Sequence, residues 1–180
     1  MARFLVAFAS REGQTEKIAH HCARRLEDRG HISRLVDLAA GETEAGADDC
    51  DAAILAGSIH RGRHESELAA FIMRHAPALR QRPGAFLSIS LAAASHDENE
   101  RSAIDELVQG FLHEVGWQPE QVLLVAGAVH DRELNALERF VLHRIVDAHG
   151  VERHPSGDTE LTDWAALDSF VDAFAALAVR

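Results

Sequence analysis

The sequence predicts an α/β protein built on a doubly wound, five-stranded parallel sheet. Short apolar runs recur along the chain, amphipathic segments with helical spacing follow them, and Gly or Pro punctuates the joins. Continuous apolar runs are typical of parallel strands, because helices cover both faces of such a sheet. Strands that alternate with helices through short connections imply right-handed crossovers and helices on both faces.

The elements of the first half follow in order. Arg3–Ala9 is nearly continuously apolar and predicts a buried strand. From Thr15 to Arg29 apolar side chains return at helical spacing, and Gly30 provides a stop. Two further strands are expected at Ile32–Leu38 and Ala52–Gly57.

The second half continues the same alternation. Glu65–Leu79 carries apolar residues at core-facing intervals and predicts a helix. A strand is expected at Gly84–Leu91, a helix at Arg101–Val115 and the fifth strand at Gln121–Ala128. Asp163–Val179 predicts a last amphipathic helix.

An inserted segment precedes this last helix, since roughly 35 residues separate it from the fifth strand where a connection of a few is usual. Apolar residues at helical spacing predict an added helix there, followed by a loop at Gly150–Thr159; they are Leu134, Leu137, Phe140, Val141 and Ile145. Such a face is either an ordinary core stripe or a surface for a substrate or partner. With no linker visible, residues 1–180 are expected to form a single domain.

Composition excludes several function classes. Eighteen Lys plus Arg against 29 Asp plus Glu give a net charge of -11, which opposes nucleic acid and anionic lipid. Cys22 and Cys50 have no metal-type spacing, and the twelve histidines form no recognised ligand set, so no metal is expected. The absence of a signal peptide or a spanning apolar run favours a cytoplasmic protein.

The loop after the first strand is the most informative one. Ser10-Arg11-Glu12-Gly13-Gln14-Thr15 joins a buried strand directly to a helix and offers hydroxyls, a glycine and free backbone N–H groups. A phosphate needs these groups, because unpaired amides and the positive end of the helix dipole favour an anion. The alternative is that Thr15 simply caps the helix after a polar turn.

These residues carry a family resemblance. Ser-x-x-Gly-x-Thr after the first strand resembles the FMN phosphate loop of flavodoxins. The chain also resembles the flavodoxin-type, quinone-coupled protoporphyrinogen oxidases of bacteria. The residues that carry this likeness are Gly57-Ser58-Ile59 with Gly62 and His64, Phe86–Leu91, Ala126-Gly127-Ala128 and Thr162-Asp163-Trp164.

The resemblance implies a flavodoxin-like fold and an FMN-dependent oxidoreductase that takes hydrogens from a reduced tetrapyrrole and passes electrons to a quinone such as menaquinone. It places the FMN phosphate on the loop Ser10, Arg11, Glu12, Gly13, Gln14 and Thr15. It places the isoalloxazine between Ser58, Ile59, His60, Arg61, Gly62 and His64 on one side and Ser90, Leu91, Ala92 and Ala93 on the other. The redox chemistry belongs to the cofactor, so no acid-base triad is required and no catalytic residue is assigned.

The sequence departs from the family in two places. It has no Tyr, and where the family has aromatics it places His60, Arg61, Arg63 and His64, which either cover a flavin face or form a solvated polar loop. The inserted segment mixes acidic and basic residues where the family is basic and aromatic, which weakens the case for contact with the inner face of the membrane. A homodimer is compatible with the sequence.

Two other functions fit the same pattern. One is a flavodoxin-like electron carrier with protein redox partners and no small-molecule substrate, which suits the acidic balance. The other is a flavin-free relative that keeps only the fold. Outside the site, Cys22 is expected to pack in the core, and Trp117 and Trp164 are expected to pack helix ends against the sheet. Thr162 is expected to cap the last helix.

Overall fold

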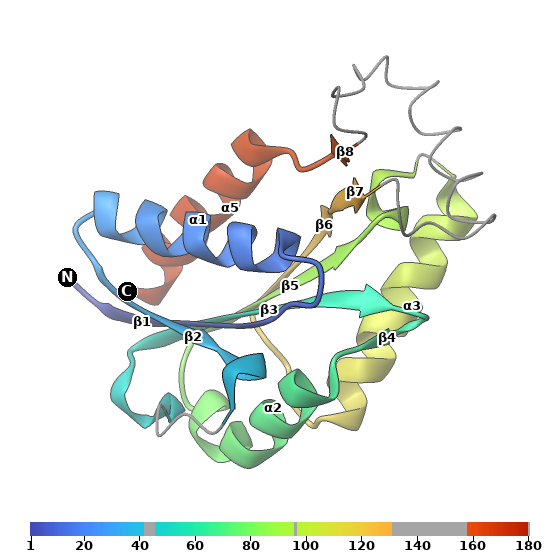
Figure 1. The fold of residues 1–180 in the computed structure, drawn as a ribbon. Coiled ribbons are helices and arrows are strands. Elements are labelled where there is room, and N and C mark those ends of the chain that lie inside the picture. The colour runs from blue at the N-terminus through green and yellow to red at the C-terminus, as the bar shows by residue number, and fades with distance from the viewer. Residues whose placement is uncertain (42–45, 96, 131–157, 180) are drawn as a thin grey trace.

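A computed structural model describes residues 1–41, 46–95, 97–130 and 158–179 (Figure 1). Its central sheet has the strand order β2-β1-β3-β5-β6, and every neighbouring pair on this path is parallel. The strands are β1 (Arg3–Ala9), β2 (Ile32–Asp37), β3 (Ala52–His60), β5 (Gly84–Ser90) and β6 (Gln121–Ala126). This confirms the predicted doubly wound, five-stranded parallel sheet.

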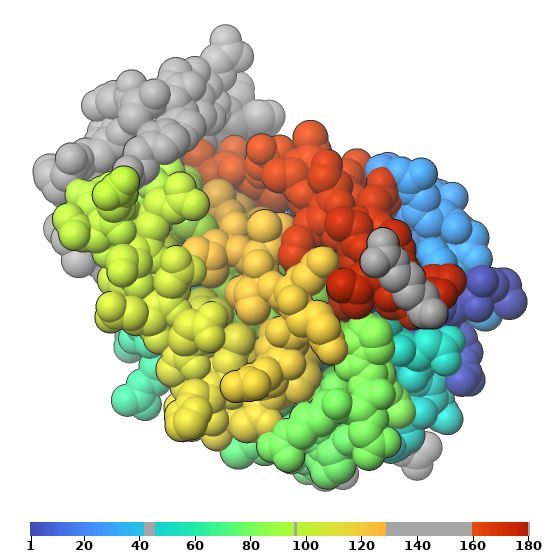
Figure 2. Space-filling model, turned by 180° about the vertical axis from the view of Figure 1, so that it is seen from behind, coloured from blue at the N-terminus to red at the C-terminus, as the bar shows by residue number. Residues whose placement is uncertain are grey.

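The helices lie on both faces of the sheet (Figure 1). Helices α1 (Gln14–Asp28) and α5 (Trp164–Ala178) cover one face, and α2 (Ser66–Leu79) and α3 (Glu98–Glu114) cover the other. Three short 3₁₀ turns lie in the connections: η1 (Leu38–Ala40), η2 (Ala47–Asp49) and η3 (Ala92–Ala94). Seen from behind, the edge strand β6 reaches the surface between α3 and α5 (Figure 2).

Alternation along the strands divides the core into two layers. Phe4, Val6 and Phe8 of β1 pack with α1 and α5, whereas Leu5 and Ala7 pack with α2 and α3. Successive side chains of a strand point to opposite faces, so a strand covered on both sides is apolar throughout. The apolar runs in the sequence follow from this arrangement.

The first and last helices are also joined by ion pairs. Arg25 donates two hydrogen bonds to Asp172, of 2.9 and 2.7 Å, and Arg29 donates to the same carboxylate. These bonds, from Arg25 and then from Arg29, lower the pKa of Asp172 to about 2. Cys22 of α1 is fully buried in the core layer that α1 shares with α5. Burial raises the pKa of its thiol to about 12, and the expected packing role is confirmed.

Three predicted boundaries were wrong. Helix α3 begins at Glu98 rather than Arg101, because the Asp97 side chain caps it by accepting the Asn99 N–H at 2.9 Å. The fifth strand ends at Ala126, and β7 (Ala128–His130) instead pairs antiparallel with β8 (Asp158–Glu160). The third strand continues past Gly57 to His60, because β4 (Arg63–His64) pairs with its end.

The inserted helix predicted around Leu134–Val146, and most of the loop at Gly150–Thr159, lie outside the described residues. Trp117 packs edge-on against Phe86 in the core, as expected, at a ring-centroid distance of 6.2 Å. The Trp164 ring instead lies in a partly exposed position against His21, 4.7 Å away. Trp117 is therefore fully buried in one core layer, whereas Trp164 is only partly buried against the other.

Both ends of the described chain lie at the amino-terminal edge of the sheet. The Ala2 N–H donates to His31 Nδ1 at 3.3 Å, and His31 lines a surface hollow together with Val179, just beyond the end of α5. Because β1 starts at this edge and α5 runs back to it, the carboxyl ends of the strands lie on the opposite side of the molecule (Figure 1).

Candidate functional site

The candidate site lies at the carboxyl ends of β1, β3, β5 and β6. The register aligns Ala9 with Gly57, Ser58 with Ile89, and Ser90 with Ala126. The chain leaves β1 for β2 on one side and returns as β3 on the other, so the strand order reverses at β1 and β3. Ligands of open α/β sheets bind at such a switch point.

The loop after β1 ends in a glycine that starts helix α1. Gly13 has φ +85° and is the N-cap, and no side chain caps the helix at this end. The Ser10 hydroxyl accepts the Gly13 N–H at 3.1 Å and folds the loop back on itself. Thr15 lies within the helix and is buried, so the alternative that Thr15 is the cap is wrong. The first amides of α1 thus form an open cradle for an anion.

The side chain of Gln14 ties this cradle to the far end of the chain. Its Nε2 donates to Thr162 Oγ1 at 2.8 Å, and the Thr162 hydroxyl donates to the Ala126 carbonyl at 2.7 Å. Thr162 therefore bridges the loop to β6, and the prediction that it caps the last helix is wrong. Asp163 caps α5 instead, its carboxylate accepting the Ala166 N–H at 2.9 Å.

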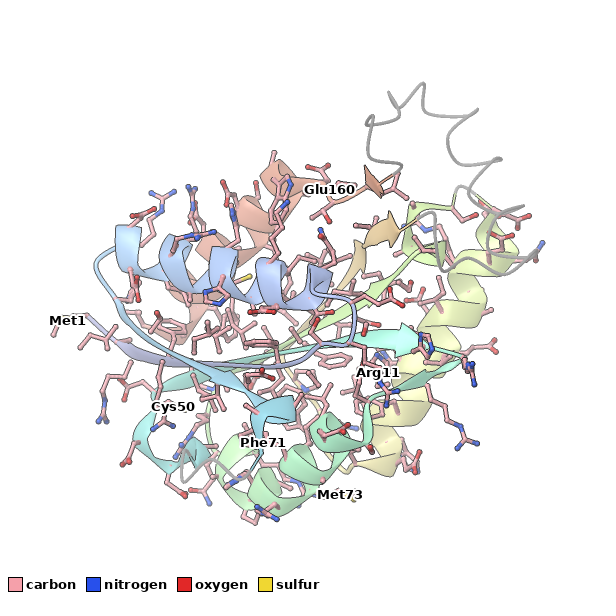
Figure 3. The ribbon with its side chains drawn as sticks, viewed as in Figure 1. Met1, Arg11, Cys50, Phe71, Met73 and Glu160 are labelled. Carbon is pink, nitrogen blue, oxygen red and sulfur yellow. The ribbon has the colours of Figure 1, made fainter. Side chains whose placement is uncertain are left out.

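The segment after β3 is a tight hairpin rather than a loop. Arg61 (φ 51°) and Gly62 (φ 76°) turn the chain so that His60 pairs with Arg63 and Ile59 with His64. Positive φ at both central residues is typical of type I′ hairpin turns. His60 Nδ1 lies 3.8 Å from Glu12 Oε1, which brings the hairpin beside the loop after β1. Arg11 lies in the same region (Figure 3).

The third predicted segment follows β5. The Ser90 hydroxyl accepts the Ala93 N–H at 3.1 Å, and the Ser90 carbonyl accepts the Gly127 N–H at 3.2 Å. Leu91 precedes η3, and Ala92 and Ala93 lie within it, all partly exposed. The structure thus brings the three sequence-predicted segments to one edge of the sheet.

His64 and Glu65 differ from what the sequence indicated. His64, considered either a flavin contact or part of a solvated loop, is only 9 % exposed. Its ring lies 4.4 Å from that of Phe111 and 5.3 Å from that of Phe86, and its Nε2 is 3.0 Å from Ser88 Oγ. The solvated-loop interpretation is therefore wrong for His64, whereas Arg61, Arg63 and His60 are exposed.

Glu65, which sequence reasoning missed as a site residue, is 5 % exposed and accepts a hydrogen bond from Ser58 Oγ. Burial raises the pKa of its carboxyl, and the bond from Ser58 opposes that rise. No sequence pattern distinguished this glutamate from an ordinary first-turn acidic residue. Only the hairpin, which turns the chain back over Gly57, places it in the interior.

The buried His64 predicts a loss of stability in acid. Burial lowers its pKa to about 4, against an ordinary value of 6.5. Below pH 6.5 the unfolded chain takes up a proton that the folded chain refuses until about pH 4, so stability falls as the pH drops through this window. We expect a loss of about 2 kcal/mol between pH 7 and pH 5 in urea unfolding of the protein without added ligand.

His64→Gln removes the titrating group, so most of this acid-dependent loss is expected to disappear. His20→Gln, at an exposed position on α1, is the matched control and should retain it. Equal pH dependence in the wild type and His64→Gln would contradict the assignment.

Metal ligands do not gather in the described part of the chain: no three His, Cys, Asp or Glu side chains there could hold an ion together. His21 instead contacts Asp168 at 2.7 Å, and His143 and His149 lie outside the described residues. Among residues 1–41, 46–95, 97–130 and 158–179, no helix is long and apolar enough to cross a bilayer.

The family model described as a flavodoxin domain matches residues 5–156. The chain belongs to the flavodoxin domain family. Membership implies that the protein binds a flavin.

Two relatives resemble the chain over most of its length. It is 27% identical to the protoporphyrinogen IX dehydrogenase (quinone) of Escherichia coli strain K12, over 96% of this chain and 94% of that protein. It is 29% identical to the protein of the same name from Leishmania major, over 96% of this chain and 74% of that protein. A flavodoxin from the domain Archaea superposes with a TM-score of 0.57 at 11% identity, covering 99% of each chain, which supports the fold alone.

The residues present fit the phosphate end of a flavin. The α1 amides are uncapped by any side chain, and a Cβ built on Gly13 would meet no atom within 4 Å, so the space in front of the loop is open. The exposed Arg11 adds positive charge beside it. Such a cradle suits the charged end of a flavin nucleotide.

Proposed function

We propose that this chain is an FMN-dependent oxidoreductase that dehydrogenates protoporphyrinogen IX and delivers the electrons to a quinone such as menaquinone. One observation carries the proposal: the two relatives named protoporphyrinogen IX dehydrogenase (quinone) match 96% of the chain each. The open amide cradle after β1 supports it, because that dehydrogenation needs a redox cofactor and the cradle suits a phosphate.

Each predicted segment has a part in holding FMN. The amides and hydroxyls of residues 10–15 would bind the phosphate, with the Gln14 side chain engaged by Thr162 and its backbone N–H left for the ligand. The hairpin at 58–62 and the turn at 90–93 would flank the isoalloxazine. When bound, FMN would supply the two-electron chemistry, and the protein would bind, orient and shield it.

The exposed cations of the hairpin suit the proposed substrate. Protoporphyrinogen IX carries two carboxylates, and Arg61 and Arg63 place positive charge beside the proposed flavin position in a chain whose net charge is -11. Arginine recognises carboxylates in a bidentate geometry. We therefore assign carboxylate recognition to Arg61 and Arg63.

Neutralising this pair should raise KM selectively. We expect the double variant Arg61→Gln, Arg63→Gln to raise KM for protoporphyrinogen IX roughly tenfold, corresponding to about 1.4 kcal/mol. KM for the dimethyl ester of the same substrate, which lacks the charges, should change little. Arg24→Gln on α1 is the exposed control. An equal rise in KM for both substrates would contradict carboxylate recognition.

The function itself is tested by anaerobic turnover. Purified protein loaded with FMN is expected to oxidise protoporphyrinogen IX with menaquinone as the acceptor. A flavin that can be reduced chemically but gives no tetrapyrrole turnover would overturn the enzyme proposal in favour of an electron carrier, a function that the acidic net charge favours. Failure of the protein to bind FMN at all would leave the flavin-free relative.

A quinone acceptor would also bring the protein to a membrane surface, since menaquinone is dissolved in lipid. We propose peripheral contact at the inner face, made without a large basic patch because the charge balance is acidic. Flotation with neutral and with anionic vesicles tests it: co-flotation with the neutral vesicles is expected, and no co-flotation with either would contradict it.

A further inference from the structure

A buried acid lies directly beneath the hairpin that follows β3. Glu65 has a relative exposure of only 5 %, and its Oε1 accepts a hydrogen bond from the Ser58 hydroxyl. Its second oxygen, Oε2, is buried and has no hydrogen-bond partner among the described residues. Buried polar atoms are nearly always paired, so an unpaired carboxylate oxygen at a ligand-binding edge points to a functional role.

The surroundings of this carboxyl come from four segments of the chain. A Cβ on Gly57 would lie 3.6 Å from Glu65 Oε2 and 3.5 Å from His64 Cδ2, so the carboxyl packs against the end of β3. Arg11, in the loop after β1, attracts the charged form, and Glu67 of α2 repels it. His64 on β4 stays neutral through most of the physiological range because burial lowers its pKa to about 4.

The bond between Ser58 and Glu65 restricts what Ser58 can offer a ligand. A serine hydroxyl has one proton to donate, and an ionised carboxylate can only accept. While Glu65 is ionised, the Ser58 proton is therefore committed to it. Once Glu65 is protonated, its own O–H can donate to Ser58 Oγ, and the Ser58 proton becomes free to donate toward the carboxyl-end edge of the sheet.

We propose that Glu65 is a positioning residue that, through the donor direction of Ser58 and its own charge beneath the hairpin, sets how the redox behaviour of the bound flavin depends on pH. The inference rests on the proposed flavin site. An ionised Glu65 opposes the negative charge that a flavin gains on reduction, by Coulomb repulsion in a poorly solvated region. A neutral Glu65 removes that repulsion and releases a hydrogen-bond donor.

The test compares midpoint potential and FMN affinity from pH 5 to pH 9 in the wild type, Glu65→Gln and Glu67→Gln. Glutamine is neutral at every pH and can still accept from Ser58, so Glu65→Gln should have the higher potential at alkaline pH and meet the wild-type curve in acid. The exposed Glu67→Gln keeps Glu65 and should retain the wild-type change of potential with pH, displaced only toward lower pH because the repulsion from Glu67 is lost. Glu65→Gln with the wild-type pH profile would overturn the inference.

Two further measurements separate the possible failures. Carboxyl-carbon NMR of the flavin-free protein, assigned with Glu65→Gln, should show a glutamate that titrates above the other glutamates; a Glu65 signal titrating with the exposed ones would overturn the inference. If Glu65→Gln does not fold, Ser58→Ala retains the acid and removes the donor, and should weaken FMN binding more at low than at high pH. A pH-independent effect of Ser58→Ala would count against the inference.

The inference and the proposed function fail in different ways. A wild-type protein that binds no FMN would overturn both. A wild-type protein that binds FMN with Glu65→Gln indistinguishable from it would overturn only the role of Glu65.

Discussion

Valine in place of Gly13 is expected to weaken FMN binding roughly 5- to 30-fold, from the 1–2 kcal/mol that a left-handed backbone costs an L-residue. Gly13 has φ +85°, and a Cβ at this position would meet no atom within 4 Å. The effect therefore comes from backbone strain and not from crowding. A valine could retain the left-handed backbone only at this cost. If its backbone relaxes instead, the N–H groups that would hold the phosphate no longer point to one place, and FMN affinity falls.

Gly30 provides a matched control for this strain. It has φ +81°, its Cβ position is equally open, and it lies just beyond the other end of the same helix. Gly30→Val carries the same backbone strain, so it should lower the free energy of unfolding by about 1–2 kcal/mol and leave FMN affinity unchanged. Equal losses of FMN affinity in both variants, measured by flavin fluorescence titration, would contradict the placement of the phosphate.

Truncation of Phe86 is expected to cause the largest loss of stability, about 3–5 kcal/mol for Phe86→Ala. Phe86 is fully buried in β5, and its ring contacts Trp117, Phe111 and His64, with centroids at 6.2, 5.7 and 5.3 Å. Removing it leaves a cavity among three rings held by the sheet and α3, which have little freedom to collapse. Urea unfolding of the flavin-free protein measures the loss.

Val122→Ala is the control for Phe86→Ala, because Val122 pairs with Phe86 across β5 and β6 but is 36% exposed. Its loss should stay within about 1 kcal/mol. Phe86→Ala should also admit water beside His64 and move the pKa of that imidazole back toward its ordinary value. A loss below that of Val122→Ala would contradict the packing described.

The strands could be predicted because burial on both faces leaves a direct trace in the sequence. Arg3–Ala9 and Gly84–Leu91 are apolar runs whose bounds agree with β1 and β5 to within a residue. The parallel order followed from alternation with helices. Helix ends that depend on a single capping side chain were harder to predict from the sequence. Asp97 caps α3 earlier than expected, and Asp163 rather than Thr162 caps α5.

The candidate site was predictable only in its local parts. The loop at 10–15 has a recognisable composition, and its glycine starts the helix as the pattern indicates. Long-range contacts have no such trace, since Gln14 and Thr162 are 148 residues apart in the sequence. The burial of His64 and Glu65 depends on a hairpin whose central Arg61 adopts a backbone conformation unusual for arginine.

The position of the two ends of the described chain has a practical consequence. Ala2 and Val179 both lie near His31, at the opposite end of the strands from the loops that would hold the cofactor. Fluorescent reporters or immobilisation tags attached at either end would therefore project away from the ligand. A circularly permuted version, with these ends linked and the chain reopened in an exposed connection, should retain the cradle intact.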